Sequence, residues 1–453
     1  MDQSLRGEVK VPKRILNNLL SALVAGVVPR QGAPYIAIGR TDEIRAMTGD
    51  LENVKDGGTA VRFLIGRYGS GKSFLIQLMR GYAMDRGFLT ADADLSPERR
   101  LSGGSGAGVA TYRELIRNLA CKASPDGEAL TAVLSRQDTQ ICSHLAENGI
   151  FPENADFSSA YRKHVFELFS SLESGVGGFD FARVVCEYFF AVRAGQDERK
   201  SACLRWLRGE FANKTEARAA LGFPVSGIID DDSWYDILKL WSRLAVKLGY
   251  AGLLVCIDEC INLYKIPNRI SRESNYEKLL AIFNDALQGR AEGLFVLFGG
   301  TPQFLEDPRR GLFSYEALRS RLADSRFVGG GYVTMASPVI RLRRLSDTEL
   351  FALLRRLTVL FSQQNGAVEV SGGEMQDFLA RALSRAGADE MITPRDITRD
   401  YLTVLYLLKD NPGATFADIV NSVAGPTEGR GQSEEKAPTA PSSSSVTLDD
   451  FEL

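Results

Sequence analysis

The chain has 453 residues, of which 44% are hydrophobic and 25% are charged, and its formal net charge is −3. This length predicts two or three domains. No apolar run approaches the length of a membrane span, and the first residues lack the pattern of a secretory signal. Six scattered cysteines and only two histidines argue against a zinc site or a histidine-based triad and favour a reducing cytoplasm. The net charge argues against a uniformly basic nucleic-acid coat but leaves room for a local basic groove.

Two features precede the first strong motif. Apolar residues recur at helical spacing over residues 9–30, which predicts an amphipathic helix that ends at Gly26. Gly39 and Arg40 then stand between a short apolar strand and a helix for which Thr41 is a suitable N-cap. Such a pair is common in turns, so by itself it is weak evidence for a binding site.

The strongest motif is the segment 66–73, which has the spacing G-x-x-x-x-G-K-S of a P-loop. An apolar strand, 60–65, precedes it and a helix follows it. Its glycines allow backbone N–H groups to turn toward phosphate oxygens, Lys72 suits the β- and γ-phosphates, and Ser73 suits Mg²⁺. We therefore expect ATP and Mg²⁺ as cofactors, with nucleotide contacts from Gly66, Arg67, Tyr68, Gly69, Ser70, Gly71, Lys72, Ser73 and Phe74.

A second strand is predicted at 87–95, followed by a glycine-rich connector at 102–108 that lacks the lysine of a phosphate loop. From about 110 to 248 the pattern is mostly helical, which is far longer than one βα crossover requires and predicts an inserted helical subdomain. Asp230, Asp231 and Asp232 fall within it. They suit either a metal site or, more commonly, the N-terminus of a helix.

An unbroken apolar run at 251–257 ends in Asp258 and Glu259. This pattern is typical of a buried parallel strand whose carboxyl end opens onto a site. Asp258 is expected to hold Mg²⁺ directly or through water, and Glu259 to polarise the attacking water. A strand that ends in two acids is by itself weak evidence for a nucleotide site, but it is strong evidence when the chain also contains a P-loop.

The next apolar strand, 293–300, ends at Thr301, which suits either a sensor of the γ-phosphate or a simple turn residue. Five arginines then fall within residues 307–327. Arg319 and Arg321 are two residues apart, so on a helix they point in different directions, and one can pair with Glu316. The other is free to serve as an arginine finger on a neighbouring subunit's nucleotide; the alternative is a solvated basic face.

Residues 346–410 are predicted to form a small helical bundle that begins with a capping box at Ser346 and Glu349. Within it, Pro394 suits a first helical turn, and Arg395 is placed to reach the γ-phosphate or to pair with Asp396 or Asp400. The composition changes at Gly425, after which we expect a disordered acidic tail that either docks a partner or serves as a solubilising terminus.

The order of these motifs resembles an AAA+ ATPase of the initiator clade that includes the Orc/Cdc6 proteins. Residues 38–43 are similar to the adenine-pocket box of that clade, which assigns Gly39 and Arg40 to the base. The resemblance implies that Thr301 is the sensor-1 residue, that Arg319 or Arg321 is the finger and that Arg395 is the sensor-2 arginine. The long insertion and the missing winged-helix domain after the lid depart from that pattern; a winged helix within 120–248 remains an alternative.

A closer resemblance is to the ATP-binding family of the BREX bacteriophage-defence systems. Residues 65–73, 88–97, 112–119 and 315–322 carry it, and together the similar segments spread over residues 36–400. It implies action with duplex DNA and with defence proteins such as a helicase, and a homo-oligomer whose assembly depends on nucleotide.

These observations predict an α/β P-loop NTPase of AAA+ type, with a parallel sheet covered by helices on both faces. We expect five segments, namely 1–109 and 250–340 as the two parts of the core, 110–249 as the insertion, 341–424 as the lid and 425–453 as the tail. The expected function is Mg²⁺-dependent ATP hydrolysis, with Glu259 and Lys72 as catalytic residues. A nucleotide-switched scaffold with little hydrolysis is the alternative, while a small-molecule kinase would need an acceptor site that the sequence does not indicate.

Overall fold

The computed structural model describes residues 10–104, 106–324, 334–384 and 393–422. Its centre is a sheet of five parallel strands in the order β2-β3-β4-β1-β5. The strands are β1 (Ala60–Ile65), β2 (Leu89–Asp94), β3 (Leu253–Asp258), β4 (Leu294–Gly300) and β5 (Val339–Arg341). Because the strands are parallel, all their carboxyl ends open onto one edge, where the P-loop follows β1 and Glu259 follows β3.

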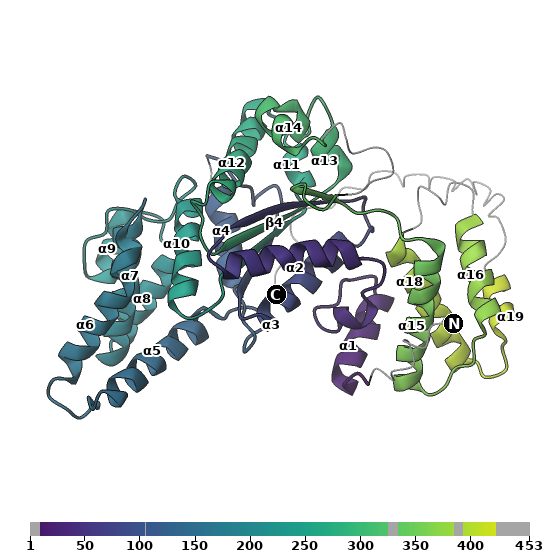
Figure 1. Ribbon diagram of the computed structural model, residues 1–453, viewed down its shortest axis with the longest axis horizontal. Helices are drawn as coiled ribbons and strands as arrows, with labels where there is room; N and C mark the ends of the chain where they lie inside the picture. Colours follow the sequence, from purple (N-terminus) through teal and green to yellow (C-terminus); the bar gives the residue numbers. More distant parts are fainter. Residues whose placement is uncertain (1–9, 105, 325–333, 385–392, 423–453) are drawn as a thin grey trace, which may run out of the picture.

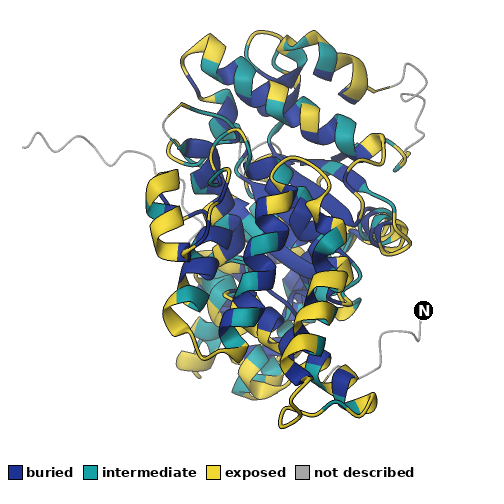
Figure 2. Ribbon diagram, turned by 90° about the vertical axis from the view of Figure 1, so that its left-hand side faces the viewer, coloured by how far each residue is buried: buried dark blue, intermediate teal, exposed yellow. Residues whose placement is uncertain are grey.

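Helices cover both faces of this sheet, as the sequence predicts (Figure 1). Side chains alternate between the faces along each strand. Phe63 of β1 lies in one core with α4 (Ala107–Arg117), α10 (Trp234–Lys247) and α12 (Arg269–Leu287). Leu64 lies in the other core with α2 (Thr41–Lys55) and α3 (Lys72–Asp85). The strands are accordingly buried along almost their whole length (Figure 2). The arrangement confirms the mixed α/β class and is compatible with a P-loop NTPase-like fold.

The segment between β2 and β3 is helical. Besides α4 and α10 it contains α5 (Leu130–Glu147), α6 (Phe157–Phe169), η3 (Ser170–Glu173), α7 (Gly178–Arg193), α8 (Asp197–Leu207) and α9 (Lys214–Leu221). Their buried residues continue the core on the α12 face of the sheet. Residues 120–248 contain helices and isolated bridges but no strand pair that could form a wing, so the alternative of a winged helix in this segment is wrong.

The helices after β5 pack beside the sheet edge that carries the P-loop (Figure 1). Among the described residues these helices are α15 (Asp347–Asn365), α16 (Gly372–Ser384), α18 (Pro394–Asp410) and α19 (Phe416–Ser422). The N-terminal helix α1 (Lys13–Val24) is shorter than the predicted 9–30 and shares the core of this lid through Leu16, Leu19 and Leu20. The first helix and the last bundle of the chain therefore form one body.

Short elements complete the carboxyl edge. They are η2 (Ala33–Ile36), α11 (Ile261–Tyr264), α13 (Pro302–Glu306), η4 (Leu312–Ser314) and α14 (Glu316–Leu322). The predicted tail at 425–453 lies outside the described residues. Among the helices that are described, none combines the length and apolar composition that a membrane span requires.

The half-buried Asp231 side chain ties the end of the insertion to the start of α4. The Asp231 carboxylate accepts hydrogen bonds from the backbone N–H groups of Gly106 (3.0 Å) and Val109 (2.8 Å), at the N-terminus of α4. No cluster of three potential metal ligands occurs among the described residues. Asp231 thus serves the N-terminus of α4, and Asp230 Oδ1 accepts from the N–H groups of Asp232 and Ser233 just before α10. Both contacts are of the kind that the helix-terminus interpretation predicts.

Asn275 of α12 gives a test of this fold. Its fully buried amide accepts from the N–H groups of Leu101 and Ser102 and donates to the carbonyl of Ser102, each at 2.9 Å. Asn275→Leu should lower the free energy of unfolding by about 3 kcal/mol, because it leaves these backbone groups unpaired in the core. Urea denaturation measures this loss. Glu277→Ala, on the exposed side of the same helix, should change stability by less than about 0.5 kcal/mol, and an equal effect of the two would contradict the account.

Candidate nucleotide-binding site

The P-loop has the backbone that its glycines predict. Gly69 (φ +74°) and Gly71 (φ +96°) adopt left-handed conformations that favour glycine, and α3 begins directly after them at Lys72. The N–H groups at the start of α3 therefore face the loop with the positive end of the helix dipole. Ser70 Oγ is buried and has no hydrogen-bonding partner among the described residues. An orphaned polar group in a loop of this shape fits a phosphate-binding cradle.

Lys72 is held within the loop by backbone carbonyls. Its ammonium donates to the carbonyl oxygens of Gly66 (2.9 Å) and Arg67 (3.0 Å). Burial lowers the pKa of Lys72, an effect that the nearby carboxylates of Asp258 and Glu259 oppose. The side chain thus lies at the phosphate end of the site with acidic groups close by.

The P-loop is joined to the end of β3 by one short hydrogen bond. Ser73 Oγ donates to Asp258 Oδ2 at 2.6 Å, across 185 positions of sequence. Gly299 of β4 makes this arrangement possible, since a Cβ at Gly299 would collide with Oδ1 of Asp258. A hydroxyl and a carboxylate oxygen side by side are hard oxygen ligands of the kind that Mg²⁺ prefers.

Glu259 has an unusual backbone conformation. Its φ of +56° is left-handed, which is uncommon for a residue other than glycine and is found disproportionately at functional sites. Its N–H donates to Asp258 Oδ1 at 2.8 Å, and Glu259 is among the residues that line the pocket. The turn after β3 therefore brings Asp258 to Ser73 and Glu259 to the wall of the pocket.

A third carboxylate, Asp94, adjoins this pair and was missed by the sequence analysis. It ends β2 directly opposite Asp258 in the register of the sheet. Desolvation, together with the negative charges of Asp258, Asp92 and Glu259, raises the pKa of Asp94 to about 6. The sequence does contain a signal for Asp94, since it ends the strand that follows the P-loop helix. Parallel strands bring their carboxyl ends together, so this position predicts a place near Asp258 and Glu259.

Arg40 connects the P-loop to the lid. Its buried guanidinium donates to the carbonyls of Ser70 (3.1 Å) and Arg343 (2.9 Å) and forms an ion pair with Glu43 at 3.2 Å. Gly39 lies under the lid, where a Cβ would approach Leu345 Cδ2 to 2.7 Å. The Gly39–Arg40 pair thus joins two parts of the chain around the pocket, and Arg40 also lines it.

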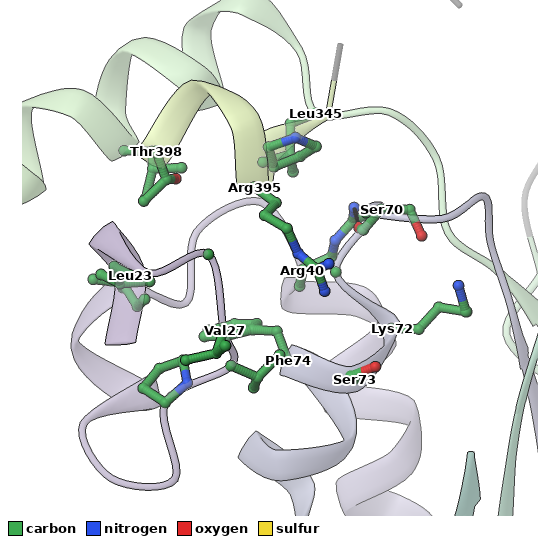
Figure 3. Close-up of a pocket in the computed structure, with 18 of the residues that line it drawn as sticks. Leu23, Val27, Arg40, Ser70, Lys72, Ser73, Phe74, Leu345, Arg395 and Thr398 are labelled. Carbon is green, nitrogen blue, oxygen red and sulfur yellow. Dashed lines mark hydrogen bonds between the residues drawn. The ribbon is translucent and has the colours of Figure 1, made fainter. Parts of the chain in front are cut away.

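The first turn of α18 contributes the lid side of the pocket. Arg395 Nη1 donates to the hydroxyl of Tyr68 at 3.2 Å, and its guanidinium lies 5.1 Å from the centre of the Tyr68 ring. Arg399, rather than Arg395, forms the ion pairs with Asp396 and Asp400. Arg395 therefore points toward the P-loop, as one of the two alternatives for this residue predicts (Figure 3).

The pocket continues from the P-loop into an apolar end. In Figure 3, Lys72 and Ser73 lie at one side, and Leu23 and Val27 lie at the other, with Phe74 between them. This end is lined by Leu23, Val27, Val28, Pro29, Ile36, Ile38, Phe74, Leu345 and Leu353. Side chains from α1, η2, α3 and the lid thus surround a space suited to a flat apolar base. Of these residues, the sequence predicts Phe74 as a contact, and Ile38 falls in the segment 38–43 that resembles an adenine-pocket box.

Several predicted site residues lie outside the described lining of this pocket. Gly66 and Arg67 line a second, adjoining cleft with Arg341 and Arg343. Thr301 caps α13, where its Oγ1 accepts from the N–H of Phe304 at 3.3 Å.

The two candidate finger arginines are exposed on α14. The Arg321 side chain donates to Asn284 Oδ1 at 3.2 Å and to the carbonyl of Ala317, whereas the Arg319 side chain makes no hydrogen bond or ion pair with a described residue. Neither forms the expected pair with Glu316 within the described part of the chain.

The strand, glycine-rich loop and helix, together with the Ser73–Asp258 contact and the apolar pocket, define an α/β protein with a P-loop nucleotide-binding site. Comparison with protein families matches residues 11–424 to the family described as BREX system ATP-binding protein BrxC/D. The chain belongs to this family of phage-defence ATP-binding proteins, which confirms the resemblance found in the sequence and supports ATP as the ligand. A search of curated proteins found no match.

The raised pKa of Asp94 gives a pH-dependent prediction. Because its pKa is about 6 in the folded chain and 3.8 ordinarily, the carboxylate destabilises the fold above pH 6, and this cost disappears as the pH falls toward 4. Asp94→Asn should therefore stabilise the nucleotide-free protein at pH 7.5 by about 1 kcal/mol, a value reduced because part of the Asp94 side chain remains in contact with solvent. The gain should shrink to nothing near pH 4.

Chemical denaturation in EDTA at several pH values measures this difference. Asp56→Asn, an exposed aspartate at the end of α2, is the control and should change stability by less than about 0.5 kcal/mol at every pH. A gain from Asp94→Asn that did not depend on pH would refute the electrostatic explanation.

Proposed function

We propose that this chain is an Mg²⁺-dependent ATPase of AAA+ type that works in phage defence as a nucleotide-dependent homo-oligomer in the cytoplasm. The observation that carries the proposal is the convergence of Lys72, Ser73, Asp258 and Glu259 at the carboxyl ends of β1 and β3. Phosphate binding alone would need only the loop. A metal-binding carboxylate followed by a second acid in the pocket is the arrangement that hydrolysis needs.

Each residue has a role within this proposal. Lys72 and the loop N–H groups hold the β- and γ-phosphates, while Ser73 and Asp258 hold Mg²⁺, which neutralises phosphate charge when bound. Glu259 accepts a proton from, or polarises, the attacking water. Arg395 contacts the γ-phosphate from the lid.

Two features favour the AAA+ type. Strand β4 lies between β1 and β3 and so brings Thr301 to the same edge as the P-loop, which suits a γ-phosphate sensor even though its hydroxyl also caps α13. The helical lid after β5 places Arg395 over the loop. Both would let the state of the nucleotide change the position of the lid.

The finger arginine is proposed to act on a neighbouring subunit. Arg319 and Arg321 are exposed on α14, outside the described lining of their own chain's pocket. Arg319 is the preferred candidate because Arg321 already bonds to Asn284. We further propose duplex DNA and a defence protein such as a helicase as partners; the support for these is the family resemblance.

Removal of the second acid tests hydrolysis directly. Glu259→Gln should lower ATP turnover at least about 100-fold, because general base catalysis is lost, while ATP binding is retained. Turnover is measured with and without duplex DNA, and Glu277→Gln on α12 is the control that should behave as wild type. If wild type binds ATP but shows no turnover under either condition, the scaffold alternative replaces the enzyme.

Mixing of variants tests the finger in trans. Arg319→Ala and Glu259→Gln should each be nearly inactive, but their mixture should recover activity, since the Glu259→Gln subunit supplies Arg319 to a neighbour with an intact Glu259. Recovery of roughly a tenth of wild-type turnover or more is expected, given that a finger contributes about 10³-fold or more. The same mixture made with Arg321→Ala distinguishes the two arginines. If neither mixture recovers activity, or if wild type remains monomeric with a non-hydrolysable ATP analogue, the finger in trans is excluded.

A further inference from the structure

Tyr68 is exposed to an unusual degree for a large aromatic residue in a ligand-binding loop. About 72% of its surface is accessible, and its main partner is the lid residue Arg395. The guanidinium both stacks over the ring and donates to the hydroxyl, so Tyr68 fixes its position in two ways.

The segment that carries Arg395 is itself fixed against the loop. Thr393 caps α18 and forms a capping box with Asp396, so the start of the helix is well defined. The Thr393 side chain packs on Gly69, where an added Cβ would lie 2.6 Å from Thr393 Oγ1. The P-loop and the first turn of α18 are therefore in contact at two successive points, Gly69 with Thr393 and Tyr68 with Arg395.

Most N–H donors of the Arg395 guanidinium are available for a ligand. Of the five N–H donors of an arginine, only the one to Tyr68 is engaged in a hydrogen bond with a described residue. The positive charge of Arg395 also contributes to the lowered pKa of Lys72, so the two cations lie at the same end of the pocket. Figure 3 shows Arg395 reaching from α18 toward the loop that carries Ser70 and Lys72.

We propose that Tyr68 is a positioning residue that holds Arg395 ready for the terminal phosphate and thereby favours a nucleoside triphosphate over a diphosphate. The proposal rests on the proposed function, since it requires ATP in this pocket. A free arginine side chain loses much rotamer freedom when it binds a ligand. Stacking on Tyr68 already restricts the Arg395 side chain before the nucleotide binds, so less rotamer entropy is lost on binding. Only a nucleoside triphosphate gains affinity from this, because Arg395 is held ready for the terminal phosphate.

The test compares ATP and ADP affinity in the presence of Mg²⁺, measured by calorimetry on the full chain. Tyr68→Ala should weaken ATP binding about fivefold, the value of one exposed cation–π contact, and leave ADP binding within about twofold. Tyr68→Phe keeps the ring and should retain most of the preference for ATP. Phe166→Ala, another exposed aromatic residue on α6, is the control and should match wild type.

A double-mutant cycle shows whether Tyr68 acts through Arg395. In the Arg395→Ala background, Tyr68→Ala should cause no further loss of ATP affinity. An equal loss in both backgrounds, or an equal weakening of ATP and ADP, would overturn the positioning role while leaving ATP binding and hydrolysis intact. If wild type binds neither nucleotide, the proposed function fails as well, so the two failures are distinguishable.

Discussion

The hydrogen bond from Ser73 to Asp258 is the contact on which the rest of the site depends. It joins the first turn of α3 to the end of β3, although β1 and β3 are not neighbours in the sheet. Strand β4 lies between them, and only a residue without a side chain at Gly299 leaves room for the Asp258 carboxylate. The proposed metal site is therefore a consequence of strand order and of one glycine on the intervening strand.

Around this contact, two arginines connect the P-loop to the lid by different means. Arg40 is buried and donates to the backbone carbonyls of Ser70 in the P-loop and Arg343 before the lid, an arrangement that suits a stable connection between them. Arg395 is held by an exposed aromatic ring and one hydrogen bond, which is a weaker arrangement and is compatible with movement toward a ligand. One side of the pocket is thus a buried contact with several hydrogen bonds, and the other is an exposed contact that holds Arg395 close to the P-loop.

The sequence predicts the parts of the site that come from one continuous segment. The P-loop residues and the Asp258–Glu259 pair follow apolar strands, so their place at a sheet edge follows from strand polarity, and the parallel α/β sheet is confirmed. Residues brought together by packing were harder to predict. The apolar wall at Val27, Val28 and Pro29 carries no motif, and it lines the pocket only because α1 packs with the lid. Likewise, no local pattern predicts that Arg40 connects Ser70 with Arg343, because Arg343 is 303 positions away from Arg40 in the sequence.

Ser73 and Asp258 are proposed to form, with the P-loop, a single site for ATP and Mg²⁺. The most direct measurement is the dissociation constant for ATP in excess Mg²⁺ and in EDTA, for wild type and for Asp258→Asn. A shared site predicts that Mg²⁺ tightens ATP binding to wild type by about tenfold or more, the equivalent of about 1.4 kcal/mol, and that Asp258→Asn loses this gain while still binding ATP in EDTA. An undiminished Mg²⁺ effect in Asp258→Asn would contradict it.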